Sequence, residues 1–170
     1  IFLRSILEAA GYKIDVFSSP HLKSYTERFV FESQEISEED LCNLLSEVGL
    51  RNGSKPITVF EFLTAAFYFY ASSKSKSDVI ISENGLFKKY DSVDSIGNHL
   101  MNISCSISED HLEWLPEGKR NIDQIIIEKT SNINSANIVV AKQSDEKILQ
   151  KLKKSIEKNP AKKILYSTDY

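Results

Sequence analysis

The chain has 170 residues, enough for one domain of ordinary size with a sizeable core and too few for much more. Its hydrophobic content of 41% and charged content of 26% are typical of a soluble globular protein. A net charge of −3 gives no reason to expect a nucleic-acid partner, and the longest apolar run, residues 62–71, is too short for a bilayer span of roughly 20 residues.

The first half of the chain alternates between helical and strand patterns. Apolar residues recur at helical spacing in the first segment, and Gly11 is a plausible stop for that helix. Ser37 is a good N-cap for the next helix, which we expect to end at Gly49. The pattern predicts helices at residues 1–10, 37–49 and 58–71, and strands at 12–17 and 29–32.

The chain opens at Ile1 rather than at a methionine, directly inside an amphipathic pattern that has no N-cap signal. We expect a helix that has been cut rather than begun. This favours a fragment, a remnant or an unusual start codon, and does not choose among them.

The second half continues the alternation of strands and helices. Strands are predicted at residues 78–82, 101–107, 137–141 and 163–166, and helices at 121–130 and 145–158. Such alternation is typical of an α/β fold with a mainly parallel sheet flanked by helices. Ligands of these sheets gather at the carboxyl ends of the strands.

The cysteines and the missing sorting signals indicate a cellular location. Cys42 and Cys105 lie far apart in sequence, which suits reduced thiols better than a disulfide framework or a zinc site. No signal peptide is visible. We therefore expect a cytoplasmic protein with no membrane and no nucleic acid among its partners.

The most informative motif is F-S-S-P-H-L at residues 17–22, followed by Y-T-E-R at 25–28. This stretch resembles the folylpolyglutamate synthase/dihydrofolate synthase family, ATP-dependent amide ligases related to the Mur ligases. Further stretches are similar to motifs of that family in chain order, at residues 35–41, 57–66, 78–86, 109–115 and 128–129. The resemblance covers most of residues 1–130.

The resemblance implies a magnesium site built from Ser19, Glu83 and His111. All three follow predicted strands, so they can meet at one edge of the sheet. Mg²⁺ prefers oxygen ligands and keeps several waters, so a short ligand set suffices, although an imidazole ligand is unusual. Each residue also has an ordinary alternative: Ser19 could shape a turn, Glu83 could be solvated, and His111 could cap or pack.

The resemblance also implies a role for Lys129, which matches a family lysine resembling a carbamylated residue whose added carboxylate helps to bind a second magnesium. The alternative is an ordinary exposed helix lysine. For a folate or dihydropteroate substrate, the implied binding residues are Ser18, Pro20, His21, Arg28 and Phe60. A structural role remains the alternative for His21.

Several departures from the family pattern affect the expected chemistry. The family's G-T-N-G-K-G-S/T loop, which supplies backbone N–H groups and a lysine to nucleotide phosphates, is not found in these residues. Phe87 and Lys88 stand where the family has two glycines, Lys89 stands where it has arginine, and Asp94 replaces an asparagine. The E-K-A-G-I-I-K motif, at residues 128–134, has also lost its glycine.

These observations predict one partial domain over residues 1–170. It would be the central ATPase domain of a Mur ligase-like protein, lacking its first strand and phosphate loop, with the C-terminal glutamate-ligase domain absent. The implied parent reaction is ATP-dependent, Mg²⁺-assisted attachment of glutamate to folate or dihydropteroate through an acyl phosphate.

We expect the chain to be a monomer. Without the phosphate-binding loop, we expect it to bind ATP and Mg²⁺ poorly and not to catalyse the reaction alone. The alternatives are a non-catalytic folate-binding module and a structural remnant. Saturable folate binding without ATPase activity would support the first of these alternatives.

Overall fold

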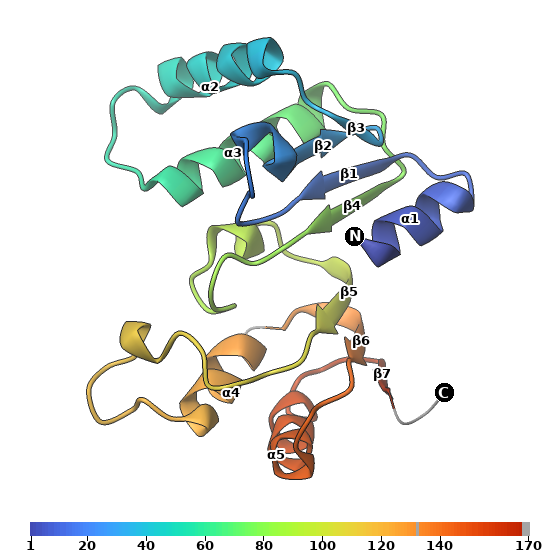
Figure 1. Ribbon diagram of the computed structural model, residues 1–170, viewed down its shortest axis with the longest axis vertical. Helices are drawn as coiled ribbons and strands as arrows, with labels where there is room; N and C mark the ends of the chain where they lie inside the picture. The colour runs from blue at the N-terminus through green and yellow to red at the C-terminus, as the bar shows by residue number, and fades with distance from the viewer. Residues whose placement is uncertain (132, 168–170) are drawn as a thin grey trace. The chain divides into compact units, whose positions relative to one another are not determined.

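The computed structural model describes residues 1–131 and 133–167 (Figure 1). Residue 132, which falls in the motif at 128–134, and residues 168–170 lie outside these ranges. The chain divides into two compact units, Ile1–Gly85 and Leu86–Tyr170, which are described separately. The single partial domain expected from the sequence stays a prediction.

The first unit is built on a four-stranded sheet with strand order β3-β2-β1-β4. β1 (Ile14–Phe17) pairs in parallel with β4 (Val79–Ser82), and antiparallel with β2 (Phe29–Phe31). β2 pairs antiparallel with the short β3 (Gln34–Glu35), which the sequence pattern did not predict. This sheet is therefore mixed rather than mainly parallel, because a two-residue turn joins β2 to β3 and such a turn can connect only antiparallel strands.

The helices of the first unit are α1 (Phe2–Ala9), α2 (Glu38–Asn52), α3 (Val59–Ser73) and the short η1 (Tyr25–Arg28). Ser37 caps α2 as predicted, and its side chain accepts from the Asp40 N–H. The predicted end at Gly49 is wrong: α2 continues to Gly53, which adopts the left-handed conformation at φ 60°. Glycine takes that conformation at little cost, so Gly53 is the stop.

Aromatic rings fill the core between α3 and the sheet. The Phe17 ring lies 5.5 Å from Phe29 and 5.2 Å from Phe67, measured between ring centroids. All three side chains are fully buried. The Phe67 ring therefore anchors α3 on β1, and edge-on and stacked ring pairs add about 0.5–1.5 kcal/mol each.

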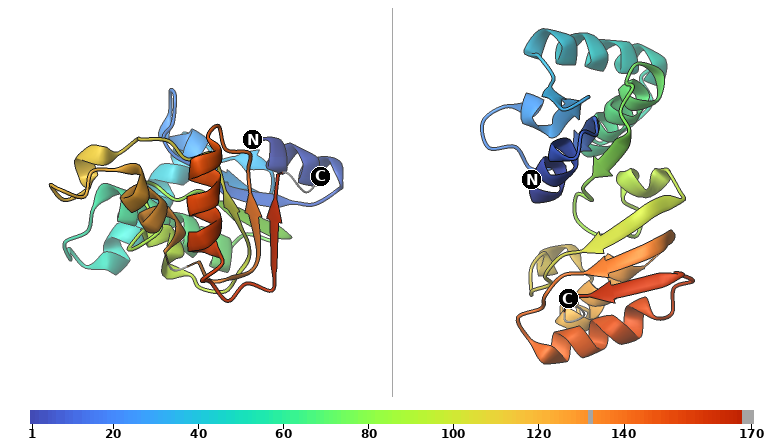
Figure 2. Two further views of the ribbon diagram at one scale, coloured as in Figure 1. Left: turned by 90° about the horizontal axis from the view of Figure 1, so that it is seen from below. Right: turned by 90° about the vertical axis from the view of Figure 1, so that its right-hand side faces the viewer.

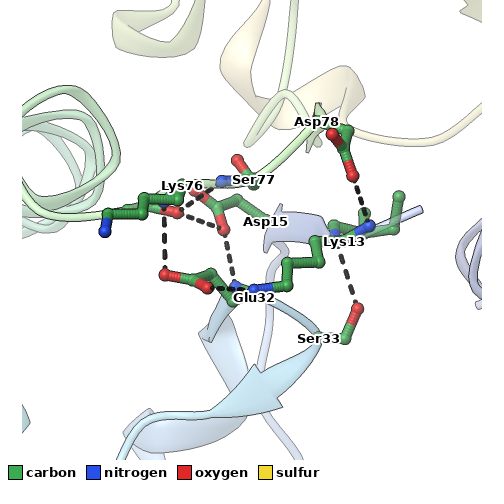
Figure 3. A network of polar contacts seen from close by, with 9 residues as sticks. Lys13, Asp15, Glu32, Ser33, Lys76, Ser77 and Asp78 are labelled. Atoms are coloured by element: carbon green, nitrogen blue, oxygen red, sulfur yellow. Dashed lines mark hydrogen bonds and ion pairs between the residues drawn. The ribbon is translucent and has the colours of Figure 1, made fainter.

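The turn between β2 and β3 is strained and is held from several sides (Figure 3). Glu32 and Ser33 have φ values of 47° and 70°, a region that residues other than glycine adopt at a cost. The fully buried Asp15 accepts from the Glu32 N–H at 2.8 Å and from the Ser75 hydroxyl at 2.9 Å. The Glu32 carboxylate in turn accepts from Lys13 Nζ at 2.9 Å. Neighbouring segments therefore keep this turn in place.

The second unit is a three-stranded parallel sheet with order β5-β6-β7. Its strands are β5 (His99–Ser104), β6 (Ser135–Val140) and β7 (Lys163–Tyr166), and its helices are α4 (Ile122–Thr130), α5 (Glu146–Ile156) and the short η2 (Ser92–Ser95) and η3 (Leu112–Trp114). Figure 2 shows β6 and β7, in orange and red, running side by side with α5 along them. The predicted parallel α/β arrangement is confirmed here.

The core of the second unit lies between its sheet and its helices. The fully buried Ile138 and Val140 of β6 belong to one cluster with Ile125 of α4 and Leu152 of α5. The strand predicted at 101–107 begins and ends earlier than expected, because the Ile107 N–H is bonded to the Gln143 side chain at 2.9 Å instead of to a neighbouring strand. No helix in the described part of the chain combines the length and the apolarity that crossing a membrane would require.

Candidate functional site

The carboxyl ends of β1 and β4 bring two predicted metal ligands together. Phe17 and Ser82 are paired at the ends of the two strands, and the Glu83 N–H donates to the Phe17 carbonyl at 2.9 Å. The Ser19 N–H then donates to Glu83 Oε2 at 3.0 Å. The backbone of Ser19 and the side chain of Glu83 therefore meet at the sheet edge that the sequence predicted.

The chemistry of this pair fits a magnesium ion. A carboxylate and a hydroxyl are both hard oxygen donors, and Mg²⁺ needs only one or two protein ligands besides water and substrate oxygens. Glu83 is exposed, so waters can reach its carboxylate. Over residues 1–131 and 133–167, no cluster of three or more His, Cys, Asp and Glu side chains forms a fuller metal site. The third predicted ligand, His111, belongs to the second unit.

The loop after Ser19 is fixed by one carboxylate. Glu27 accepts from the backbone N–H groups of Leu22, Lys23 and Ser24, at 2.7–2.9 Å. These hydrogen bonds, with that from Leu22 the strongest, hold the pKa of the Glu27 carboxyl below its usual value. Ser24 and Glu27 also form a capping box at the start of η1. The predicted binding loop is therefore ordered by its own residues.

Two of the predicted substrate-binding residues contact each other. Arg28 Nε donates to His21 Nδ1 at 2.9 Å, and the His21 ring packs on the Tyr25 ring with centroids 4.3 Å apart. The Arg28 carbonyl accepts from the Ser18 N–H at 3.2 Å, which places this group at the end of β1. Pro20, in a cis peptide with Ser19, is exposed. The roles of these residues in substrate binding stay predictions.

Phe60 lies against the backbone that follows Glu83. A Cβ added at Gly85 would stand 2.6 Å from the tip of the Phe60 ring, closer than any side chain tolerates. The same ring packs against Phe17, with the centroids 5.8 Å apart. Phe60 is therefore half-buried between the aromatic core and the backbone at the carboxyl end of β4.

Replacing Gly85 by alanine is expected to push the Phe60 ring out of place and to lower the free energy of unfolding by about 1–3 kcal/mol, because the new methyl group overfills the site. Thermal unfolding of the variant checks this. Gly49→Ala is the matched control: the nearest atom, also on a phenylalanine ring, lies 3.8 Å from the added Cβ. That change inside α2 should stabilise the protein by about 0.5–1 kcal/mol. Equal effects at the two positions would contradict the expectation.

In the second unit, one carboxylate joins the other two predicted site residues. Lys129 Nζ lies 3.4 Å from Asp110 Oδ1, and His111 Nε2 lies 3.8 Å from Asp110 Oδ2. His111 has a left-handed backbone with φ 58° and sets its ring edge-on to Phe87. Sequence reasoning missed Asp110, although the D-H dipeptide that contains it was the signal that selected His111. Carbamylation of Lys129 stays a prediction.

The positions that depart from the family pattern also form a group. Lys88, only 5% exposed, makes an ion pair with Asp94, whose side chain is 15% exposed. His99 Nε2 lies 3.4 Å from the same oxygen, Asp94 Oδ1. Lys88 and Asp94, which in the sequence look like two separate departures from the family pattern, are therefore ion-pair partners in the folded chain.

Comparisons with known proteins give a consistent result. No family model matches the chain. The chain is 36% identical over 122 residues to dihydrofolate synthase/folylpolyglutamate synthase of Escherichia coli, a match that covers 71% of the chain and 28% of that protein. It is 28% identical over 167 residues to the protein of the same name in Bacillus subtilis, covering 94% of the chain and 38% of the relative.

Solved structures agree with these relatives. E. coli FolC in complex with ADP matches with a TM-score of 0.79 and 29% identity, over 96% of this chain and 38% of that one. FolC in complex with DHPP and ADP matches with a TM-score of 0.76 and 30% identity, over 96% of this chain and 37% of that one. The FPGS–AMPPCP complex, at 21% identity and a TM-score of 0.77 over 95% of this chain and 40% of that one, shows the fold alone.

The fold is that of a partial Mur ligase-like α/β domain. The chain belongs to the folylpolyglutamate synthase/dihydrofolate synthase family. It spans 28% and 38% of the length of the two curated relatives described above.

Proposed function

We propose that this chain is part of an ATP-dependent ligase that joins glutamate to folate or dihydropteroate. The contact between the Ser19 N–H and the Glu83 carboxylate carries the proposal, because it brings the two predicted metal ligands together at the carboxyl end of a parallel strand pair. The names of the relatives support the reaction, and their solved structures include complexes with ADP and with DHPP.

The predicted site residues would have different roles in the reaction. Ser19 and Glu83 would hold Mg²⁺, which supplies neutralisation of charge on the transferred phosphoryl group. Ser18, Pro20, His21 and Arg28 would line the acid substrate, with Phe60 as an apolar wall. In the second unit, His111 and Lys129 would have the roles that the resemblance implies, and both lie near the Asp110 carboxylate.

We propose that these 170 residues do not catalyse by themselves. They contain no G-T-N-G-K-G-S/T motif, and in-line phosphoryl transfer depends on holding the phosphates in place. The buried pair of Lys88 and Asp94 favours the second candidate function, a non-catalytic folate-binding module, because it replaces flexible glycine-containing sequence with a fixed loop. A cytoplasmic location and a monomeric state complete the proposal.

The metal site can be tested with Mg²⁺ alone on the 170-residue chain. The Ser19 amide donates a hydrogen bond to the Glu83 carboxylate. Its signal in a ¹⁵N–¹H correlation spectrum should therefore shift as Mg²⁺ is added, and the shift should saturate. Glu83→Gln removes the charge and should weaken this response about tenfold or more, about 1.4 kcal/mol. Glu39→Gln, an exposed change on α2, is the control and should leave it unchanged. A Ser19 amide signal that does not shift when Mg²⁺ is added would contradict the proposed metal site.

The ligase assignment needs a separate assay. Dihydropteroate and a reduced folate are titrated into the chain by calorimetry, and ATP-dependent incorporation of glutamate is followed in the same samples. Saturable binding without incorporation is expected. Incorporation of glutamate by the chain alone would overturn the proposal that the chain is not catalytic. If neither dihydropteroate nor the reduced folate binds, the proposed substrate class is wrong.

A further inference from the structure

His111 has a strained backbone, and its ring is open to solvent. Its φ of 58° lies in a region that residues other than glycine adopt at a cost. The His111 carbonyl accepts from the Trp114 N–H at 3.1 Å, and Leu115, directly after this turn, is only 4% exposed. The His111 side chain is 38% exposed. Strained residues persist where the surrounding structure enforces them, and they cluster at functional sites.

The Phe87 ring lies against the His111 ring. The two ring centroids are 6.3 Å apart, and the ring planes stand at 88° to each other. Phe87 is half-buried and packs against the core cluster of the second unit, which includes Ile125 and Ile138. The Phe87 side chain therefore connects the His111 ring to this core, and the backbone at residue 87 decides where the contact forms.

The residue after Phe87 is fastened at its backbone and at its side chain. The Lys88 N–H donates to the Glu128 carbonyl at 3.1 Å, in the last turn of α4, and the buried Lys88 ammonium pairs with Asp94 of η2. Asp91 closes the loop between them: its N–H donates to the Lys88 carbonyl at 3.2 Å, and its carbonyl accepts from the Asp94 N–H at 3.1 Å. Residues 88–94 therefore form one ordered turn that is attached to α4.

These contacts depend on side chains that the family pattern does not have at these positions. Phe87 and Lys88 stand where the family has glycine, which offers neither a ring nor an ammonium. The contact with His111 and the ion pair with Asp94 are therefore features of this chain's own sequence.

We propose that Lys88 and Asp94 are a positioning pair. Their ion pair fixes the backbone at residue 88, and this keeps the Phe87 ring against His111, so that the exposed imidazole is held in one orientation. The pair acts through Phe87. The role of His111 in the reaction rests on the proposed function, whereas the orientation of its ring does not.

The ring contact is measured by nuclear Overhauser effects between the ring protons of Phe87 and His111. The chain has three histidines, so their signals can be assigned by single substitutions. The unaltered chain should show a Phe87–His111 cross-peak, because rings in this edge-on arrangement bring hydrogens close together. Lys88→Met should lose most of this cross-peak, and its His111 ring signals should move toward those of Phe87→Leu, which removes the neighbouring ring.

Lys89→Met is the matched control, because it removes the adjacent lysine at an exposed position. It should leave the cross-peak and the His111 signals unchanged. An unaltered chain without the cross-peak, or a full-strength cross-peak in Lys88→Met, would overturn the proposal.

The double variant, Lys88→Met with Asp94→Asn, separates positioning from stability. It leaves no buried charge of this pair without its partner, so part of the stability that Lys88→Met loses should return. The cross-peak should stay weak, because the connection between residues 88 and 94 is still missing. A cross-peak that returned together with the stability would overturn the positioning role. The double variant also supplies the test if Lys88→Met does not fold.

These spectra need neither substrate nor Mg²⁺, so their outcome is independent of the proposed function. A retained ring contact that depends on Lys88, found together with no binding of dihydropteroate or Mg²⁺, would support the positioning pair and overturn the proposed function.

Discussion

Replacing Asp15 by alanine is expected to lower the free energy of unfolding by about 2–4 kcal/mol, because two donors lose their acceptor at a fully buried position. The Glu32 N–H and the Ser75 O–H would each lose their acceptor, while the Ser75 oxygen would still accept from the Ser77 N–H. Glu32 also needs that bond to stay at φ 47°, so the turn between β2 and β3 should loosen. Urea unfolding measures the loss, and amide hydrogen exchange at Glu32 and Ser33 locates it.

Two controls separate this effect from a general loss of charge. Asp78→Ala removes an exposed carboxylate that accepts from the Lys13 N–H in the same network, and it should cost about 1 kcal/mol or less. Asp15→Asn keeps an oxygen for the two donors and should fall between the two alanine variants. A loss of under about 1 kcal/mol in Asp15→Ala would show that the carboxylate does not hold the turn.

Replacing Lys88 by methionine is also expected to lower the free energy of unfolding strongly. Lys88 is 5% exposed and pairs with Asp94, so its removal leaves a largely buried carboxylate without its ammonium partner. Breaking a buried ion pair from one side typically costs about 3–5 kcal/mol. His99 Nε2, 3.4 Å from the same oxygen, remains as a polar neighbour of the carboxylate in this variant. Urea unfolding measures the loss of stability.

The double variant tests whether the two residues are matched. Asp94→Asn alone leaves the buried ammonium unpaired, and should also be costly. Combining Lys88→Met with Asp94→Asn removes both charges, so the double variant should lose less stability than the sum of the single variants, with a coupling of about 1–3 kcal/mol. Additive losses would mean that Lys88 and Asp94 contribute independently and that their contact is incidental.

The sequence predicted the elements that depend on local patterns. Periodicity located the helices, and the end of β1 combined with the end of β4 placed Ser19 near Glu83, as the structure confirms. The turn at Glu32 and Ser33 was not predicted, because those residue types rarely take positive φ and the carboxylate that holds them comes from Asp15. The end of α2 was missed for a similar reason: Gly49 is a tolerated helix glycine, and the choice of Gly53 depends on the packing of the last turn.

In the candidate site, too, the sequence predicted single residues but not the contacts between them. Motifs selected His111 and Lys129 separately, but only the fold shows Asp110 between them. Likewise, Lys88 and Asp94 look in the sequence like two independent losses from a family pattern. Their compensation depends on the fold of the loop, which brings an ammonium and a carboxylate together away from water.

In residues 1–131 and 133–167, β4 lies at one edge of the first sheet, and this position has a practical consequence for handling the protein. β4 is the outermost strand of that sheet, and its residues Val79–Ser82 include no charge and no proline. Ile80 at its centre is 46% exposed. Natural proteins usually protect such an edge with lysine, proline or a bulge, because an open apolar strand can template pairing between molecules. Concentrated samples of this chain are therefore at risk of self-association into aggregates that begin at β4.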